Sequence, residues 1–140
     1  GEGPANVLVV ANETILGDAL LQKIRERAAR SPASFLIVAP QGDSASSYDD
    51  AERRLRRALA ALRGAGIDVH GQISHPDPYT ATMQALRDER VDELIVSTYP
   101  AQRSGWLRRD LIGRLRKDAR VPVVDHVVVE PAHARAAEVA

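Results

Sequence analysis

The chain has 140 residues, of which 44% are apolar, and this composition suits one domain with a single hydrophobic core. Its 19 basic and 19 acidic residues balance, so neither nucleic acid nor an anionic membrane is expected as a partner. The absence of cysteine excludes a disulfide scaffold and a cysteine-zinc site. The longest apolar runs are far shorter than the roughly 18 residues of a membrane span, and no signal-peptide pattern appears, so we expect a cytoplasmic protein.

Five apolar runs alternate with segments of helical periodicity. The runs are rich in Val, Ile and Leu, which is typical of parallel strands buried on both faces. The predicted strands cover residues 6–11, 34–39, 67–73, 93–97 and 121–129.

Four helices are predicted between these strands. The first covers residues 17–29, and the second runs from Asp49 to Gly64. The third has Asp77 as its N-cap and Pro78 at the first helical position, and the fourth has Ser104 as its N-cap. The predicted buried stripes, in the order of the helices, are Leu16, Leu20 and Ile24; Leu55, Leu59 and Leu62; Tyr79, Met83 and Leu86; and Leu107, Leu111 and Leu115.

This alternation predicts an α/β fold with an open, doubly wound, five-stranded and mainly parallel sheet. The expected strand order is 3-2-1-4-5, with helices on both faces in a Rossmann-like arrangement. The domain is expected to cover residues 1–130, and a tail to cover residues 131–140. Ligands of such sheets bind at the carboxyl ends of the strands, where the order reverses. Asn12 and Ser97 would flank that point, between the first and fourth strands.

Several known sites are excluded by their motifs. The first strand is followed by ANETILGD and not by the glycine pattern that binds dinucleotides. The acidic residues and the lysine of a receiver domain are missing. The four histidines, at positions 70, 75, 126 and 133, lack metal-binding spacing, so no metal is expected. His75, Asp77 and Ser97 form one candidate for a small hydrolase or nucleotidyl transferase, but Ser97 lacks the G-x-S-x-G context of an exposed nucleophile.

The most basic part of the chain covers residues 103–120. The fourth helix is expected to end near residue 120, and cations in its last turn complement the helix dipole. Arg103, Arg108 and Arg109 instead lie near the predicted start of the helix, where an anion is favoured. We therefore expect these arginines to bind a small anionic ligand or to pair within the protein.

From NVLVVANET to VPVVDHVVV the chain resembles the universal stress protein family. The resemblance rests on the order of the five strands, on HPDP before the third helix, on VDELIVS before the following loop, and on the R-x-P-V start of the last strand. It implies a stress-response or regulatory binding module without catalytic activity, and with no resident cofactor.

Nucleotide-binding members of that family carry a G-x2-G-x9-G-[ST] motif around the phosphates. The matching positions here are Val96, Tyr99, Arg109 and Asp110, so ATP binding of the usual kind is not expected. One alternative is a nucleotide-binding member in which side chains replace the glycine loop. These side chains would be Ser97, Thr98, Arg103, Arg108 and Arg109, with Asn12 near the ribose or base.

The family resemblance also implies a homodimer formed through the last strand. Pro122 tolerates only a strand start or an edge, and an apolar edge invites a partner. We expect antiparallel pairing of two copies through residues 123–129, with Val123, Val124, Val127 and Val129 in the interface.

Overall fold

The computed structural model describes residues 3–41 and 45–131. The expected tail therefore lies outside the described residues, except for Pro131. Five strands form one sheet, and each lies within two residues of its predicted bounds. The strands are β1 (Ala5–Val10), β2 (Ala33–Pro40), β3 (Asp68–Ser74), β4 (Glu93–Thr98) and β5 (Val123–Val128).

The sheet has the order β3-β2-β1-β4-β5, and all neighbouring pairs are parallel. This confirms the predicted fold class and strand order. Since β1 pairs with both β2 and β4, the winding direction reverses at β1, and the switch point lies between β1 and β4.

Within the described residues five helices connect the strands, one more than predicted. The helices are α1 (Asp18–Arg30), α2 (Ala45–Gly64), α3 (Pro78–Asp88), α4 (Gly105–Arg108) and α5 (Leu111–Asp118). The predicted N-caps of the third and fourth helices are confirmed, because Asp77 accepts from the Thr80 N–H at 2.9 Å and Ser104 from the Leu107 N–H at 3.1 Å. The second helix begins four residues before the predicted Asp49.

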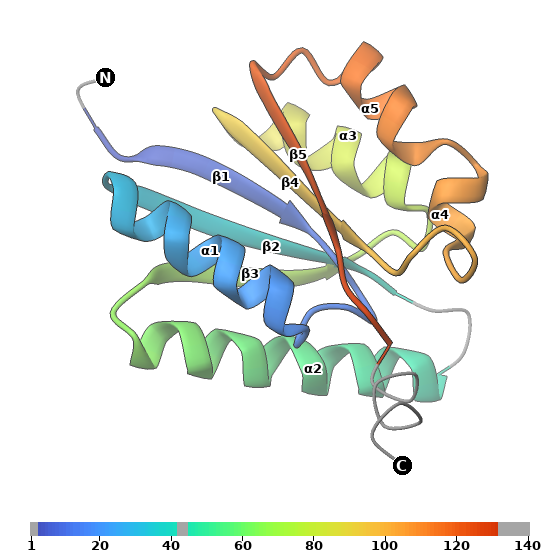
Figure 1. Cartoon of the computed structure of the whole chain (residues 1–140), viewed down its shortest axis with the longest axis horizontal. Helices are drawn as coiled ribbons and strands as arrows, with labels where there is room; N and C mark the ends of the chain where they lie inside the picture. The colour runs from blue at the N-terminus through green and yellow to red at the C-terminus, as the bar shows by residue number, and fades with distance from the viewer. Residues whose placement is uncertain (1–2, 42–44, 132–140) are drawn as a thin grey trace.

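The helices cover both faces of the sheet (Figure 1). On one face α1 and α2 pack through residues such as Leu20, Ile24 and Leu62. On the other, α3, α4 and α5 pack through residues such as Leu111 and Leu115. Alternate side chains of each buried strand enter the two cores, which explains their nearly continuous apolar sequence.

The inward face of α3 differs from the prediction. Tyr79, Met83 and Leu86 are only partly buried, whereas the small residues Ala81, Thr82 and Ala85 face the sheet. In the same way Ala58 of α2 is fully buried. Small side chains let these helices lie close to the sheet, and the larger residues fill the flanks.

The prediction of a single helix from Ser104 onward is wrong. It is split at Asp110, whose φ of 54° is left-handed and ends α4. The Asp110 N–H donates to the Leu107 carbonyl at 3.0 Å, and a Cβ added at Gly113 would lie 2.6 Å from both Asp110 carboxylate oxygens. Asp tolerates the left-handed region better than most residues, and Gly113 leaves room for its side chain.

This break changes the electrostatic argument for Arg108 and Arg109. Arg108 lies in the last turn of α4 and Arg109 is its C-cap. Cations at the C-terminal end of a helix complement its dipole. The expectation that both arginines oppose a helix dipole is therefore wrong, and any role in anion binding must rest on where their side chains lie.

Strand β5 is an edge of the sheet, as predicted, but the four valines of the expected interface are not equivalent. Val123 is 39% exposed, while Val124 and Val127 are partly buried against the two cores. Val129 is only 4% exposed and lies in the core beside Gly17. Its side chain is therefore unavailable to a partner, which corrects that part of the prediction.

None of the helices among the described residues is long and apolar enough to cross a membrane. Within residues 3–41 and 45–131, no group of three or more acidic or histidine side chains is arranged to hold a metal ion.

Candidate binding site at the sheet switch point

A cavity of about 280 Å³ opens at the carboxyl ends of β1 and β4. The chain leaves β1 for α1 on one face of the sheet and leaves β4 for α4 on the other, so the two loops diverge and leave a crevice. Its lining residues are Asn12, Glu13, Thr14, Ser97, Thr98, Tyr99, Arg103, Ser104, Gly105, Trp106 and Arg109.

Five of the six residues predicted for a ligand site line this cavity. They are Asn12, Ser97, Thr98, Arg103 and Arg109. Arg108 is exposed on α4 and does not line the cavity. Arg108 and Arg109 are neighbours at the end of α4, but only Arg109 lines the cavity, so the two arginines do not act together there as the sequence predicted.

The Asn12 side chain is held on both sides by the protein. Its Nδ2 donates to the Pro40 carbonyl at 2.7 Å, and its Oδ1 accepts from Nη2 of Arg54 at 2.8 Å. Arg54 Nε also donates to the Asn12 carbonyl at 3.3 Å. No motif of the sequence singles out Arg54, and its only signal is that it lies four residues, or one turn, before the buried Ala58. Arg54 fixes the loop after β1, and with it one wall of the cavity.

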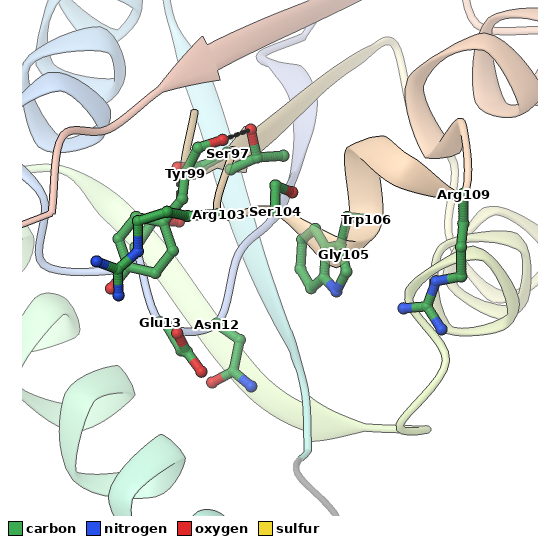
Figure 2. Close-up of a pocket in the computed structure, with 11 residues that line it drawn as sticks. Asn12, Glu13, Ser97, Tyr99, Arg103, Ser104, Gly105, Trp106 and Arg109 are labelled. Carbon is green, nitrogen blue, oxygen red and sulfur yellow. Dashed lines mark hydrogen bonds between the residues drawn. The ribbon is translucent and has the colours of Figure 1, made fainter. Parts of the chain in front are cut away.

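Ser97, at the end of β4, is hydrogen-bonded to the same loop after β1. Its hydroxyl donates to Oγ1 of Thr14 at 2.7 Å, and the two side chains are 1% and 4% exposed. This bond joins the end of β4 to the loop after β1 (Figure 2).

The three residues of the hydrolase alternative do not lie together in the structure. His75 and Asp77 follow β3, which is separated from β4 by β2 and β1. At about 4.8 Å per strand the ends of β3 and β4 lie roughly 14 Å apart. His75 Nδ1 instead accepts from the Asp77 N–H at 3.0 Å. Ser97, His75 and Asp77 therefore do not form a nucleophile–base pair.

Thr98 connects the cavity to the edge strand. Its hydroxyl donates to the Tyr99 carbonyl at 2.7 Å and lies 2.9 Å from Nε2 of His126 on β5. Because the Thr98 proton is used on the carbonyl, His126 must be the donor to Thr98, which assigns a proton to its Nε2.

Two backbone positions of the loop from Tyr99 to Ser104 offer no free donor. Pro100 has no N–H, and the Arg103 N–H donates to the Pro100 carbonyl at 2.8 Å. A glycine-rich loop cradles phosphate with successive backbone N–H groups, and Pro100 and Arg103 interrupt such a succession here.

Tyr99 and Arg103 form one side of the cavity, with Glu13 and Asn12 beneath them (Figure 2). The Arg103 guanidinium lies over the Tyr99 ring, 5.9 Å from its centroid. Burial and the negative charge of Glu13 raise the pKa of Tyr99, while Arg103 and Arg54 oppose that rise. Tyr99 is therefore a neutral phenol at physiological pH, able to donate or accept a hydrogen bond.

Trp106 and Arg109 form the other side (Figure 2). Hydrogen bonds from Thr80 hold the pKa of Asp77 below its usual range, and the charges of Arg114 and Arg109 lower it further. Arg109 therefore lies in the field of a carboxylate of this protein while also lining the cavity. Two arginines against one glutamate give the lining a positive balance.

The partly buried position of His126 predicts a pH-dependent stability. Burial and the charge of Arg116 lower its pKa below the ordinary 6.5, so the folded state favours the neutral ring. The stabilising contribution is complete above pH 6.5 and is lost as the pH falls through the lowered value. We expect the difference in unfolding free energy between the parent and His126→Gln to shrink from about pH 7.5 to about pH 5 in urea titrations.

The exposed His70 offers a matched control for this measurement. His70→Gln makes the same chemical change at an exposed position and shows how far the replacement of a histidine by itself alters the measurement. A His126→Gln difference that stays constant with pH would contradict the assignment.

No protein-family model matches the chain, and no curated protein sequence does. Solved structures with the same fold include universal stress proteins from three organisms. The protein from Burkholderia pseudomallei has 17% identity and a TM-score of 0.65, over 89% of this chain and 97% of that one. The protein from Arabidopsis thaliana with AMP bound has 17% identity and a TM-score of 0.59, over 93% and 94%. The protein from Archaeoglobus fulgidus in complex with dAMP has 16% identity and a TM-score of 0.61, over 89% and 97%.

The chain therefore has the fold of universal stress proteins along nearly its whole length. The resemblance inferred from the sequence is confirmed at the level of the fold.

Proposed function

We propose that this chain is a non-catalytic regulatory module of the universal stress protein kind. In this proposal it binds a small phosphate-bearing ligand, of the nucleoside monophosphate class, in the cavity between β1 and β4. The observation that carries the proposal is the convergence of Arg103, Arg109 and four hydroxyl side chains on this one cavity at the switch point. The hydroxyls belong to Thr14, Ser97, Thr98 and Ser104.

Side chains rather than backbone would bind the phosphate. Pro100 and the bonded Arg103 N–H interrupt the succession of free N–H groups that a glycine loop offers, whereas an arginine can hold phosphate with two parallel hydrogen bonds. The Ser104 hydroxyl oxygen accepts a hydrogen bond from the Leu107 N–H, so the hydroxyl proton stays available for donation to a ligand.

The size of the cavity favours a small ligand. A volume of about 280 Å³ lies just below the usual range for ligand pockets, about 300–1,000 Å³. The tyrosine and tryptophan on its two sides suit a planar base, and the Arabidopsis and Archaeoglobus proteins are in complex with AMP and dAMP, respectively. A monophosphate also needs fewer donors than the triphosphate of ATP.

The proposal of a binding role without catalysis rests on the state of the possible nucleophiles. The Ser97 and Thr98 hydroxyls are both committed to protein acceptors, and no described histidine contacts Ser97. In known nucleophilic sites a base lies within hydrogen-bond reach of the attacking hydroxyl.

Isothermal titration with AMP, ATP and inorganic phosphate tests the ligand class. We expect AMP to bind more tightly than ATP. The double variant Arg103→Ala, Arg109→Ala should bind AMP at least about tenfold more weakly, since hydrogen bonds to charged groups contribute about 1.5–3 kcal/mol each.

Arg108→Ala is the matched control, because Arg108 is an exposed arginine of the same helix that does not line the cavity. Its AMP affinity should equal that of the parent. Equal loss in the control and the double variant, or no binding of AMP at all, would overturn the proposed ligand. Consumption of AMP or ATP during the titration would show an enzyme instead.

A further inference from the structure

The hydrogen-bonding side chains of the cavity are unevenly divided between donors and acceptors. Arg103, Arg109 and the indole of Trp106 can only donate. The Ser104 hydroxyl keeps its proton for a ligand. Among the described residues that line the cavity, Glu13 alone has a side chain that only accepts hydrogen bonds at neutral pH. The lining therefore suits a group rich in acceptors, such as a phosphate, together with a donor at one position.

The two residues next to Glu13 in the sequence already use their side-chain oxygens within the protein. Asn12 Oδ1 accepts from Nη2 of Arg54 at 2.8 Å. Thr14 Oγ1 likewise accepts from the Ser97 hydroxyl at 2.7 Å. The Glu13 side chain is exposed, and within the described part of the chain no hydrogen bond or ion pair engages its carboxylate. Its two oxygens thus stay available to a donor group of a ligand.

Glu13 lies on the tyrosine side of the cavity. Figure 2 shows its side chain beneath Tyr99, across the cavity from Arg109. Burial raises the pKa of the Tyr99 phenol, and the nearby negative charge of Glu13 raises it further. A phosphate beside Glu13 would meet a like charge, so we expect the phosphate nearer Arg109. A base packed against Tyr99 would then turn one edge toward the carboxylate.

We propose that Glu13 determines which base the cavity accepts, by taking a hydrogen bond from an amino group on the edge of that base. This inference rests on the proposed binding of a nucleoside monophosphate and adds the chemical class of its base. A base edge that presents only acceptors leaves the carboxylate without this bond and sets lone pairs against it. Because Glu13 is exposed, water replaces part of the lost bond, and the preference is smaller than in a buried polar site.

Isothermal titration with two ligands that differ only in this amino group tests the proposal. AMP carries the group on the six-membered ring of its purine, and purine riboside monophosphate has hydrogen in its place. We expect the parent protein to bind AMP about tenfold more tightly than this analogue. In Glu13→Ala the ratio of the two affinities should fall to about one, and inorganic phosphate should bind more tightly than to the parent, because a like charge has been removed.

Two further variants serve as controls. Asp88→Ala removes an exposed acid of α3 that does not line the cavity, so it should retain the full preference for AMP. Glu13→Gln keeps one acceptor oxygen without the charge and should retain part of that preference. Thermal unfolding of Glu13→Ala should match that of the parent, since the side chain is exposed.

The possible failures can be told apart. Equal affinity of the parent for AMP and the analogue would overturn this inference and leave the nucleotide site standing, whereas no binding of AMP at all would overturn both. A preference for the amino group that persists in Glu13→Ala would assign it to another residue. If Glu13→Ala instead loses only a preference for AMP over its deoxy form, Glu13 binds the ribose and not the base.

Discussion

Replacing Arg27 with alanine should lower the free energy of unfolding by up to about 3–5 kcal/mol, because it leaves the largely buried carboxylate of Glu93 with only the exposed Arg30 at 3.9 Å. Arg27 of α1 is 6% exposed and binds Glu93 at the start of β4 with two parallel hydrogen bonds of 2.8 Å. Its Nη1 also donates to the carbonyl and the hydroxyl of Ser31 at 3.1 Å. The hydrogen bond with Glu93 raises the pKa of Arg27 further, so the guanidinium is permanently charged. Urea denaturation measures the loss.

The exposed Arg25 on the same helix is the control, and Arg25→Ala should change the unfolding free energy by no more than about 0.5 kcal/mol. The pair Arg27→Met, Glu93→Leu removes both charges together. It should be more stable than Arg27→Ala alone, because no buried charge is left unpaired. If Arg27→Ala unfolds no more readily than Arg25→Ala, the ion pair does not hold α1 to β4.

A methyl group added at Gly17 should destabilise the fold by about 1–3 kcal/mol, the usual cost of overpacking a core. The new Cβ would lie 2.3 Å and 2.9 Å from the two methyl carbons of Val129 and 3.1 Å from the Thr14 carbonyl oxygen. Val129 is buried and β-branched, so its methyl groups cannot rotate away freely. Thermal and urea unfolding of Gly17→Ala measure the loss.

Shortening the opposing side chain should relieve this clash. In a double-mutant cycle, Gly17→Ala combined with Val129→Ala should lose less stability than the two single changes added together. Additive losses would mean that the backbone near Gly17 shifts to admit the methyl group. The same displacement would move Thr14, so the AMP affinity of Gly17→Ala should fall with its stability.

The fold could be predicted because its signals are local and mutually consistent. Runs such as 35–39 are apolar along their whole length, and this run is followed by a segment with helical spacing. Asp77 with Pro78, and Ser104, mark helix starts through side-chain caps that act within one turn. These patterns leave few topologies once right-handed crossovers are required.

The break at Asp110 was not predictable from periodicity, because Leu107, Leu111 and Leu115 continue the same spacing across it. The signal that could have revealed it is Gly113, the small residue three positions later that makes room for the Asp110 carboxylate. This one backbone angle decides which end of a helix dipole Arg108 and Arg109 occupy.

The candidate site was predictable in position but not in detail. Parallel strands bring Asn12 and Ser97 together at the switch point, as the sequence indicated. Arg54 joins them from α2, more than 40 residues away from both, and no pattern along the chain connects these positions. Side-chain contacts between distant segments depend on helix placement, which periodicity does not define.

Trp106 is the only tryptophan of the chain, and it stands in the wall of the cavity. Any intrinsic indole emission of the protein therefore originates from this one place. A ligand that stacks on the ring or excludes water from it will change the intensity or the wavelength of that emission. The molecule thus carries its own optical reporter of occupancy, and candidate ligands can be screened without a label.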